Sequence, residues 1–294
     1  MKMHDGELNI DAELVGRLVA AQFPALSDLP ISRVQSTGTV NAIYRIGHHL
    51  YARLPRMQKW AQDLDTEWLW LPKLAPGLSL NVPEPVGKGQ PSSSYPCPWA
   101  IYGWIEGQPY ADELIDDEDQ AARDLAQFVV ELRRTDHVAG APPAGRRPLR
   151  ELDAVTRAAI GSARRVIDSD AATDAWELAL EAPAWAGTPV WIHTDLLRPN
   201  LLALDGRLCA VLDFGGVGVG DPAADVIAAW SVFSHAGRGM FRDALDVEDG
   251  TWNRARGFAL HQAAMIIPYY EVTNPGFVAL ARRTVEEVLA DLNP

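Results

Sequence analysis

One segment in the second half of the chain constrains the fold more than any other, because its polar residues are separated by short apolar runs. It contains His193, Asp195 and Asn200, and it ends on Asp213 in the tripeptide Asp-Phe-Gly. The Asp-Gly-Arg sequence at 205–207 is typical of a hairpin turn, and the apolar run after it predicts a strand that leads into Asp213. A hairpin returns the chain to its starting point, so we expect Asp213 to share a cleft with Asp195 and Asn200.

The residue types in this segment suit phosphoryl transfer from a nucleoside triphosphate. The triphosphate carries several negative charges, which Mg²⁺ neutralises through hard oxygen ligands. Asp213 supplies a carboxylate and Asn200 an amide oxygen, so both are predicted metal ligands. Asp195 is predicted to bind the acceptor hydroxyl and aim it at the terminal phosphorus, where positioning counts for more than basicity. The expected cofactors are ATP, or GTP, and Mg²⁺.

Taken singly, these residues have a plainer interpretation, since Asp and Asn before apolar segments are usually caps or turn residues. The ordered set of His, Asp, Asn and Asp-Phe-Gly favours catalysis. We expect His193 to support the loop through a hydrogen bond rather than to react. Asp225 stands inside a predicted helix, where Asp has poor propensity. It is expected either to brace the backbone of the catalytic loop or to face solvent.

The chain as a whole has 294 residues, of which 48% are hydrophobic, and this size suits two lobes that share a cleft. The net charge of −13 disfavours nucleic acid and anionic membranes, and it favours cations or simple solubility. The two cysteines, Cys97 and Cys209, form no disulfide or metal-binding pattern. Residues 1–14 lack the charge and apolar length of a signal peptide, and no run approaches the roughly 18 apolar residues that span a bilayer. We expect a cytoplasmic protein, monomeric or weakly dimeric.

The two halves of the chain differ in predicted secondary structure. Strands are predicted over 31–36, 41–46, 50–54 and 99–105. Helices are predicted over 11–23, 58–71, 121–133, 149–160, 172–180, 222–233, 252–267 and 277–292. The sequence therefore predicts an α+β fold. A small β-rich lobe over 1–104 would bind nucleotide, a hinge would lie near 100–105, and a larger, mostly helical lobe over 105–294 would carry the catalytic loop and the acceptor site.

The catalytic segment resembles the aminoglycoside phosphotransferase family, whose members share the protein-kinase fold. Residues 191–195, 200–202, 206–207, 213–215 and 220–225 carry the resemblance, and residues 268–275 add to it. It implies a bilobal, protein-kinase-like architecture. It also implies that Asp195 is the catalytic residue and that Asn200 and Asp213 hold Mg²⁺.

Two positions depart from the family's pattern. Thr194 stands where members usually have Gly, so its Cβ is expected to alter the loop geometry or to crowd the substrate. Arg53 takes the place of the lysine in the third strand, with Lys59 as the other candidate, and its guanidinium can bridge phosphate oxygens and a carboxylate. Glu67, on the following helix, resembles the glutamate that pairs with this cation. A surface arginine and a solvated glutamate are the plainer interpretations.

The resemblance also implies a nucleotide loop at the first turn of the sheet, where Ser36 and Thr39 flank a single glycine. Both hydroxyls are predicted to donate to phosphates or to shape the turn. Ala100, Tyr102 and Trp104 belong to the predicted hinge, whose backbone would hydrogen-bond the adenine edge.

The family's antibiotic substrates carry ammonium groups, so an acidic pocket would suit the acceptor. The candidate substrate-binding residues are Asp112, Asp116, Trp252, Tyr270 and Glu271, with a second acidic cluster at 243–249. Solvated acids and core aromatics are the plainer interpretations. A cationic acceptor such as an aminoglycoside is expected. A kinase for choline, an amino alcohol or a sugar is an alternative, as is a nucleotide-binding module without turnover.

Overall fold

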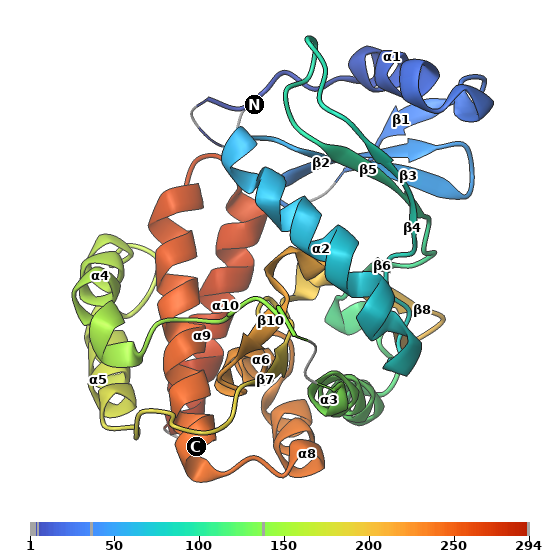
Figure 1. Cartoon of the computed structure of the whole chain (residues 1–294). Helices are drawn as coiled ribbons and strands as arrows, with labels where there is room; N and C mark the ends of the chain where they lie inside the picture. Colours follow the sequence, from blue (N-terminus) through green and yellow to red (C-terminus); the bar gives the residue numbers. More distant parts are fainter. Residues whose placement is uncertain (1–3, 5, 36–37, 137–138, 293–294) are drawn as a thin grey trace.

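The computed structural model describes the chain except for residues 1–3, 5, 36–37, 137–138 and 293–294. Two lobes lie one above the other (Figure 1). The smaller lobe is built around a β-sheet, and the larger one consists mostly of helices. The predicted α+β composition is therefore confirmed.

The sheet of the smaller lobe has the strand order β1-β2-β3-β5-β4, and all neighbouring strands are antiparallel. Its strands are β1 (Ile31–Arg33), β2 (Asn41–Ile46), β3 (Leu50–Pro55), β4 (Pro85–Gly89) and β5 (Trp99–Gly103). Gly47 begins the β2–β3 turn with φ at 58°, a conformation that glycine adopts without a Cβ clash. Since β5 lies between β3 and β4, both of its edges are paired.

Two helices cover opposite faces of this sheet, α1 (Ala12–Gln22) and α2 (Ala61–Leu74). Asp11 caps α1, because its carboxylate accepts the N–H of the third helical residue. The apolar stripe of α1 packs on the face that carries Ile101. Successive strand residues face opposite ways, so Ala100 and Tyr102 point to the other face, where they pack with Leu64 of α2.

The larger lobe is organised around one long helix. Its helices are α3 (Glu118–Arg134), α4 (Leu149–Ser162), α5 (Ser169–Leu180), α6 (Ala223–Val226), α7 (Ala228–Ser231), α8 (His235–Leu245), α9 (Asp249–Tyr270) and α10 (Pro275–Leu292). Buried residues recur along most of α9, which contacts α4, α5, α6, α7 and α10. A helix that buries several faces belongs at the centre of a lobe, and Figure 1 shows α9 in that place.

Short strands in the larger lobe hold both ends of the polar segment. The strands are β6 (Gln108–Pro109), β7 (Val190–Ile192), β8 (Leu201–Leu204), β9 (Arg207–Val211) and β10 (Gly218–Gly220). β7 pairs with β10, and β8 lies between β6 and β9. The predicted hairpin joins β8 to β9, with Asp205 and Gly206 both at positive φ. The turn therefore returns the chain as expected and brings Asp213 back toward the catalytic loop.

Several elements differ from the sequence predictions, among them the unpredicted strands β4 and β6. α8 is not predicted, since Gly237 and Gly239 lower its helix propensity. Close packing on α3 compensates for this low helix propensity. A Cβ on Gly237 would come within 2.8 Å of the Glu118 side chain, so the glycine lets α8 approach α3. The single helix predicted over 222–233 is interrupted at Ile227 into α6 and α7.

None of the helices in the described part of the chain combines the length and the apolarity that crossing a bilayer requires.

Candidate active site

The loop that carries Asp195 and Asn200, the predicted catalytic loop, connects β7 to β8, and a buried carboxylate anchors its start. Asp225 of α6 is completely buried, and it accepts hydrogen bonds from two consecutive backbone N–H groups. The N–H of His193 lies 2.9 Å from Asp225 Oδ2, and that of Thr194 lies 2.7 Å from Oδ1. This arrangement accounts for an aspartate inside a helix, because both oxygens satisfy groups that would otherwise be buried without partners.

The ring of His193 supports the loop from inside. Its Nε2 lies 3.0 Å from the carbonyl oxygen of Leu212, and its Nδ1 lies 3.3 Å from the backbone N–H of Asp195. A carbonyl only accepts and an N–H only donates, so these partners fit the neutral ring protonated at Nε2. The ring also packs edge-on against Phe214, with centroids 4.7 Å apart. His193 thereby ties the catalytic loop to the segment that carries Asp213.

Thr194 adopts a left-handed backbone conformation with φ at 79°. A β-branched residue is disfavoured there, whereas glycine is not. The Thr194 hydroxyl donates to the carbonyl of Gly216 at 3.3 Å, and its N–H is held by Asp225. The predicted effect of Thr194 on loop geometry thus takes the form of a strained residue held by hydrogen bonds.

The carboxylate of Asp195 is held at both oxygens. Asn200 donates through Nδ2 to Oδ2 at 2.8 Å, and Gln262 of α9 donates through Nε2 to Oδ1 at 2.9 Å. Burial raises the pKa of Asp195 and the charge of Asp213 adds to the effect, while the charge of Arg146 and the Gln262 bond act in the opposite direction.

Arg53 of β3 connects the two lobes. Its guanidinium donates to Glu67 of α2 and to Asp213, each at 2.5 Å. With its amide oxygen turned toward Arg53, Asn41 of β2 accepts from Nε and Nη2, both at 2.9 Å. Burial works to raise the pKa of Asp213, but the attraction of Arg53 outweighs it and the pKa falls. Glu67 is completely buried and also accepts the N–H of Phe214 at 2.7 Å.

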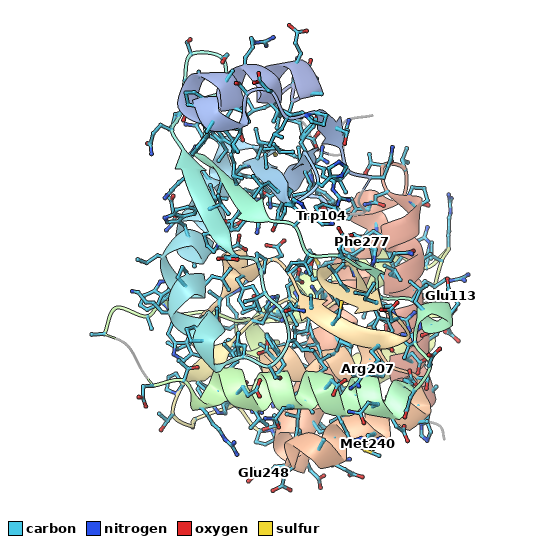
Figure 2. All side chains as sticks on the ribbon, turned by 90° about the vertical axis from the view of Figure 1, so that its right-hand side faces the viewer. Trp104, Glu113, Arg207, Met240, Glu248 and Phe277 are labelled. Atoms are coloured by element: carbon cyan, nitrogen blue, oxygen red, sulfur yellow. The ribbon has the colours of Figure 1, made fainter. Side chains whose placement is uncertain are left out.

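A cavity of about 250 Å³ lies between the lobes. Both lobes contribute to its lining, which includes Thr39, Asn41, Tyr51, Arg53, Trp104, Ile105, Gly107, Asp195, Asn200, Leu202, Leu212, Asp213 and Phe277. Figure 2 shows Trp104 and Phe277 at the boundary between the lobes, whereas Glu248 lies at the far end of the larger lobe.

Two oxygen atoms on this cavity are suited to bind a magnesium ion that a phosphate also binds. The Nδ2 of Asn200 binds Asp195, so the amide oxygen is the atom left for a cation. Asp213 binds Arg53 through Oδ1, which leaves Oδ2 for the same purpose. In the described part of the chain, no group of three or more His, Cys, Asp or Glu residues could hold a metal by itself. Mg²⁺ needs only one or two protein ligands when phosphate and water complete its shell.

The predicted nucleotide residues separate into two groups. Thr39, Arg53 and Trp104 line the cavity, and Glu67 lies behind Arg53. Ser36 falls outside the described residues. Ala100 and Tyr102 are fully buried on the central strand β5 and do not line the cavity, so their assignment to the adenine site is corrected. The strand ends at Gly103, and the lining resumes at Trp104, Ile105 and Gly107.

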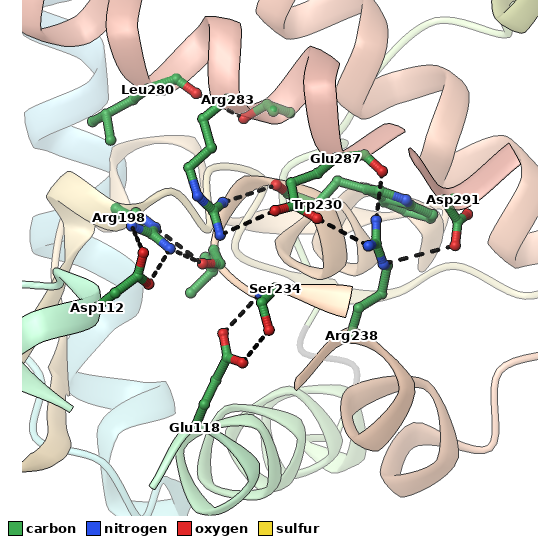
Figure 3. Close-up of polar contacts among 12 residues, drawn as sticks. Asp112, Glu118, Arg198, Trp230, Ser234, Arg238, Leu280, Arg283, Glu287 and Asp291 are labelled. Carbon is green, nitrogen blue, oxygen red and sulfur yellow. Dashed lines mark hydrogen bonds and ion pairs between the residues drawn. The ribbon is translucent and has the colours of Figure 1, made fainter. Parts of the chain in front are cut away.

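The predicted acceptor residues are mostly dispersed. Trp252 is 5% exposed and packs on Trp230 with ring centroids 4.5 Å apart, so it is a core residue and its prediction as a substrate contact is wrong. Asp112 is paired with Arg198 at 2.5 Å (Figure 3). Asp116 is exposed beside the β8–β9 turn, where its N–H donates to Gly206. None of these three lines the cavity.

Tyr270 and Glu271 stand at the end of α9. Tyr270 packs against Phe277, which lines the cavity, with ring centroids 5.5 Å apart. Burial raises the pKa of Tyr270, and the charge of Asp195 is close enough to add to the effect. Glu271 is exposed. The acidic cluster at 243–249 belongs to the α8–α9 region and contributes nothing to the cavity lining.

The structure adds three polar residues that sequence reasoning missed: Asn41, Arg146 and Gln262. Asn41 begins a strand and Arg146 lies in a loop rich in glycine and proline, where polar residues are ordinary. Gln262 and the neighbouring His261 interrupt an apolar stretch of α9, which is the one available signal.

The Phosphotransferase enzyme family model matches residues 33–258, well over half of the chain. The chain belongs to this phosphotransferase family. The resemblance drawn from the catalytic segment is confirmed, and the protein is an enzyme of the phosphotransferase class, as predicted.

Solved structures extend the likeness to nearly the full chain. The GDP complex of wild-type aminoglycoside 2'-phosphotransferase-IIIa is 21% identical, covers 96% of this chain and 100% of that one, and has a TM-score of 0.76. The GDP and kanamycin complex of APH(2")-IIia is 20% identical, with coverages of 94% and 98% and a TM-score of 0.74. Macrolide 2'-phosphotransferase MphH from Brachybacterium faecium is 21% identical, with coverages of 94% and 97% and a TM-score of 0.60. At these identities the likeness concerns the fold, and it confirms the predicted kinase-like architecture.

A similar protein also occurs in Bacillus subtilis (strain 168). The uncharacterized protein YcbJ is 26% identical over 198 residues. The match spans 62% of this chain and 62% of YcbJ, so it covers less than two thirds of that relative's length.

Proposed function

We propose that this phosphotransferase moves the terminal phosphate of ATP, or GTP, to a hydroxyl group of a small molecule, with Mg²⁺ as the metal. The observation that supports this proposal most strongly is that Asp195, Asn200 and Asp213 all line one cavity between two lobes. Asp195 and Asn200 lie on one loop, the β8–β9 hairpin brings Asp213 back beside them, and phosphoryl transfer needs all three.

The chain's own residues have separate tasks in the transfer. Asp195 accepts the hydrogen bond of the acceptor hydroxyl and aims its oxygen at the terminal phosphorus. Asn200 and Asp213 are the residues that would hold Mg²⁺, which supplies charge neutralisation to the phosphate oxygens when bound. Arg53 adds a fixed positive charge beside the phosphates, because Glu67 holds its guanidinium in place. Positioning and electrostatics therefore account for the rate enhancement.

The nucleotide base is proposed to bind at the linker between the lobes. Backbone groups of residues 104–107 follow the last paired residue of β5, and Trp104, Ile105 and Gly107 line the cavity. Thr39 faces the same cavity from the turn before β2, which supports a role at the phosphates.

The acceptor is proposed to be a small cationic molecule of the aminoglycoside type. The net charge of −13 supports this class, and so does the exposed Glu271 beside Tyr270. APH(2")-IIia has been solved with kanamycin, and APH(2")-IIa with gentamicin. A metabolite kinase for an amino alcohol would use the same catalytic groups, so acceptor screening separates the two.

The test is an assay of nucleoside diphosphate release with Mg-ATP and Mg-GTP against aminoglycosides, macrolides, choline and sugars, with product mass confirmed. We expect turnover with at least one acceptor and a loss of at least about 100-fold in Asp195→Asn. Asp205→Asn is the matched control, because Asp205 is an exposed turn residue at φ 49°, which Asn tolerates. Wild-type turnover in Asp195→Asn would refute the proposed role.

A further inference from the structure

A glutamine and an arginine that the proposed transfer does not use lie directly behind Asp195. Gln262 of α9 donates through Nε2 to Asp195 Oδ1 at 2.9 Å. Arg146, in the loop before α4, donates through Nη2 to Gln262 Oε1 at 2.7 Å. The three side chains come from three separate elements, and they form one continuous chain of hydrogen bonds.

Chemistry fixes the direction of this chain. A guanidinium has only donors, and an ionised carboxylate only accepts. The amide of Gln262 must therefore turn its oxygen toward Arg146 and its NH₂ toward Asp195. An amide placed between a cation and an anion is polarised by both, which strengthens the two bonds.

Arg146 has no carboxylate within ion-pair distance among the described residues. Its other contacts are the carbonyl of Thr194, 3.3 Å from Nη1, and the ring of Phe258, whose centroid lies 5.9 Å from the guanidinium carbon. Burial lowers the pKa of Arg146, and the charges of Asp195 and Asp225 oppose this effect. A half-buried cation is costly without a counter-charge. A side-chain route of hydrogen bonds to one runs through Gln262 to Asp195.

We propose that Arg146 and Gln262 are positioning residues for the transfer. Gln262 holds Oδ1 of Asp195 while Asn200 holds Oδ2, so the carboxylate cannot rotate about its Cβ–Cγ bond without breaking one of these bonds. Arg146 holds Gln262 and, through the Thr194 carbonyl, the backbone just before Asp195. Neither residue needs to touch nucleotide or acceptor. The proposal rests on the proposed function of Asp195.

The first test separates positioning from binding. In Gln262→Leu we expect kcat to fall about 10- to 100-fold, since small misplacements of a reacting group have effects of that order. The KM values for Mg-ATP and for the acceptor should stay within about twofold. Gln127→Leu is the matched control, because Gln127 donates to Glu131 at 2.9 Å on the exposed surface of α3. A raised acceptor KM with unchanged kcat would make Gln262 a substrate contact and overturn the proposal.

The second test asks whether the two residues act in series. Arg146→Met should lower kcat, Arg146→Lys should recover part of that loss, and Arg146→Met combined with Gln262→Leu should lose less than the product of the two single losses in kcat. Groups that act through one another are non-additive, whereas independent structural effects add. Additive losses in kcat in the double variant would overturn the proposal that Arg146 acts through Gln262.

A structural readout keeps this proposal distinct from the proposed function. Crystal structures of the wild type and Gln262→Leu should show the Asp195 carboxylate rotated in the variant, with the loop backbone unchanged. An unrotated carboxylate overturns the proposal even if the enzyme is active. If the wild type phosphorylates no acceptor, the proposed function fails, while the rotation still decides whether Gln262 positions Asp195.

Discussion

At the residue scale, Thr194 shows how hydrogen bonds maintain an unfavourable backbone conformation at a catalytic loop. Its φ of 79° suits glycine, yet both its N–H and its hydroxyl have partners. A non-glycine residue in a sparsely populated region costs on the order of 1–3 kcal/mol. The surrounding bonds outweigh this cost in the native state.

Replacing Thr194 by glycine separates the strain from the hydroxyl bond. Thr194→Ala keeps the Cβ strain and loses the bond, so the free energy of unfolding should fall by about 1 kcal/mol. Thr194→Gly also relieves the strain, so it should be more stable than Thr194→Ala by about 1 kcal/mol after the entropic cost of glycine. Chemical denaturation of the three proteins measures both differences. A Thr194→Gly protein less stable than Thr194→Ala would show that φ carries no strain.

At the element scale, His261 of α9 contacts both α4 and α5. The hydroxyl of Thr156 on α4 donates to the carbonyl of Leu152 at 2.7 Å, so it accepts from Nδ1 of His261 at 2.8 Å. The ring also lies against Trp176 of α5, with centroids 6.3 Å apart. Burial lowers the pKa of His261 to about 4, and the positive charge of Arg146 contributes.

The lowered pKa of His261 predicts that the free energy of unfolding depends on pH. The unfolded chain binds a proton to His261 near pH 6.5, whereas the folded protein does so only near pH 4. The unfolded state therefore holds more protons between these values, and stability contributed by His261 is present above pH 6.5 and lost as the pH falls toward 4. Between pH 7 and pH 5 the loss should be about 1–2 kcal/mol.

Denaturation at several pH values, compared between the wild type and His261→Gln, measures that loss. The variant should show a shallower decline over the same range. His235→Gln is the control, since His235 is exposed at the start of α8. Parallel profiles for wild type and His261→Gln would contradict the assignment.

At the scale of the whole molecule, one arginine links the two lobes at the cavity, beside the apolar packing of α2 on the larger lobe. Arg53 of the smaller lobe binds Asp213 of the larger one, and the same guanidinium is held by Glu67 and Asn41. The planar guanidinium of arginine can donate to all of these partners at once, whereas the ammonium of lysine is a single point charge. The ion pair therefore both orients the proposed phosphate contact and ties the lobes at the cavity.

Arg53→Lys should consequently weaken Mg-nucleotide binding by about tenfold, which corresponds to about 1.4 kcal/mol. Calorimetric titration with Mg-ADP measures this change. Arg17→Lys provides the control, because Arg17 forms an exposed pair with Glu13 on α1. Equal affinities for Arg53→Lys and the wild type would remove Arg53 from the nucleotide site.

The parts of the site that sequence reasoning recovered lie on local patterns. His193, Asp195, Asn200 and Asp213 stand in a short segment whose hairpin brings them together. Asp225, by contrast, could be placed only as an alternative between bracing and solvation. Its partners are 31 and 32 positions away, and such a contact leaves no periodic trace.

The sequence by itself determined the α+β composition, the phosphotransferase family and the grouping of Asp195, Asn200 and Asp213, because apolar periodicity, turn residues and a compact motif act over short distances along the chain. Only the tertiary structure decided that Trp252 belongs to the core, that Ala100 and Tyr102 are buried in a central strand, and that Arg146 and Gln262 stand behind Asp195. These outcomes depend on which distant elements pack together. Burial and hydrogen bonding between distant residues follow from three-dimensional proximity and not from spacing in the sequence.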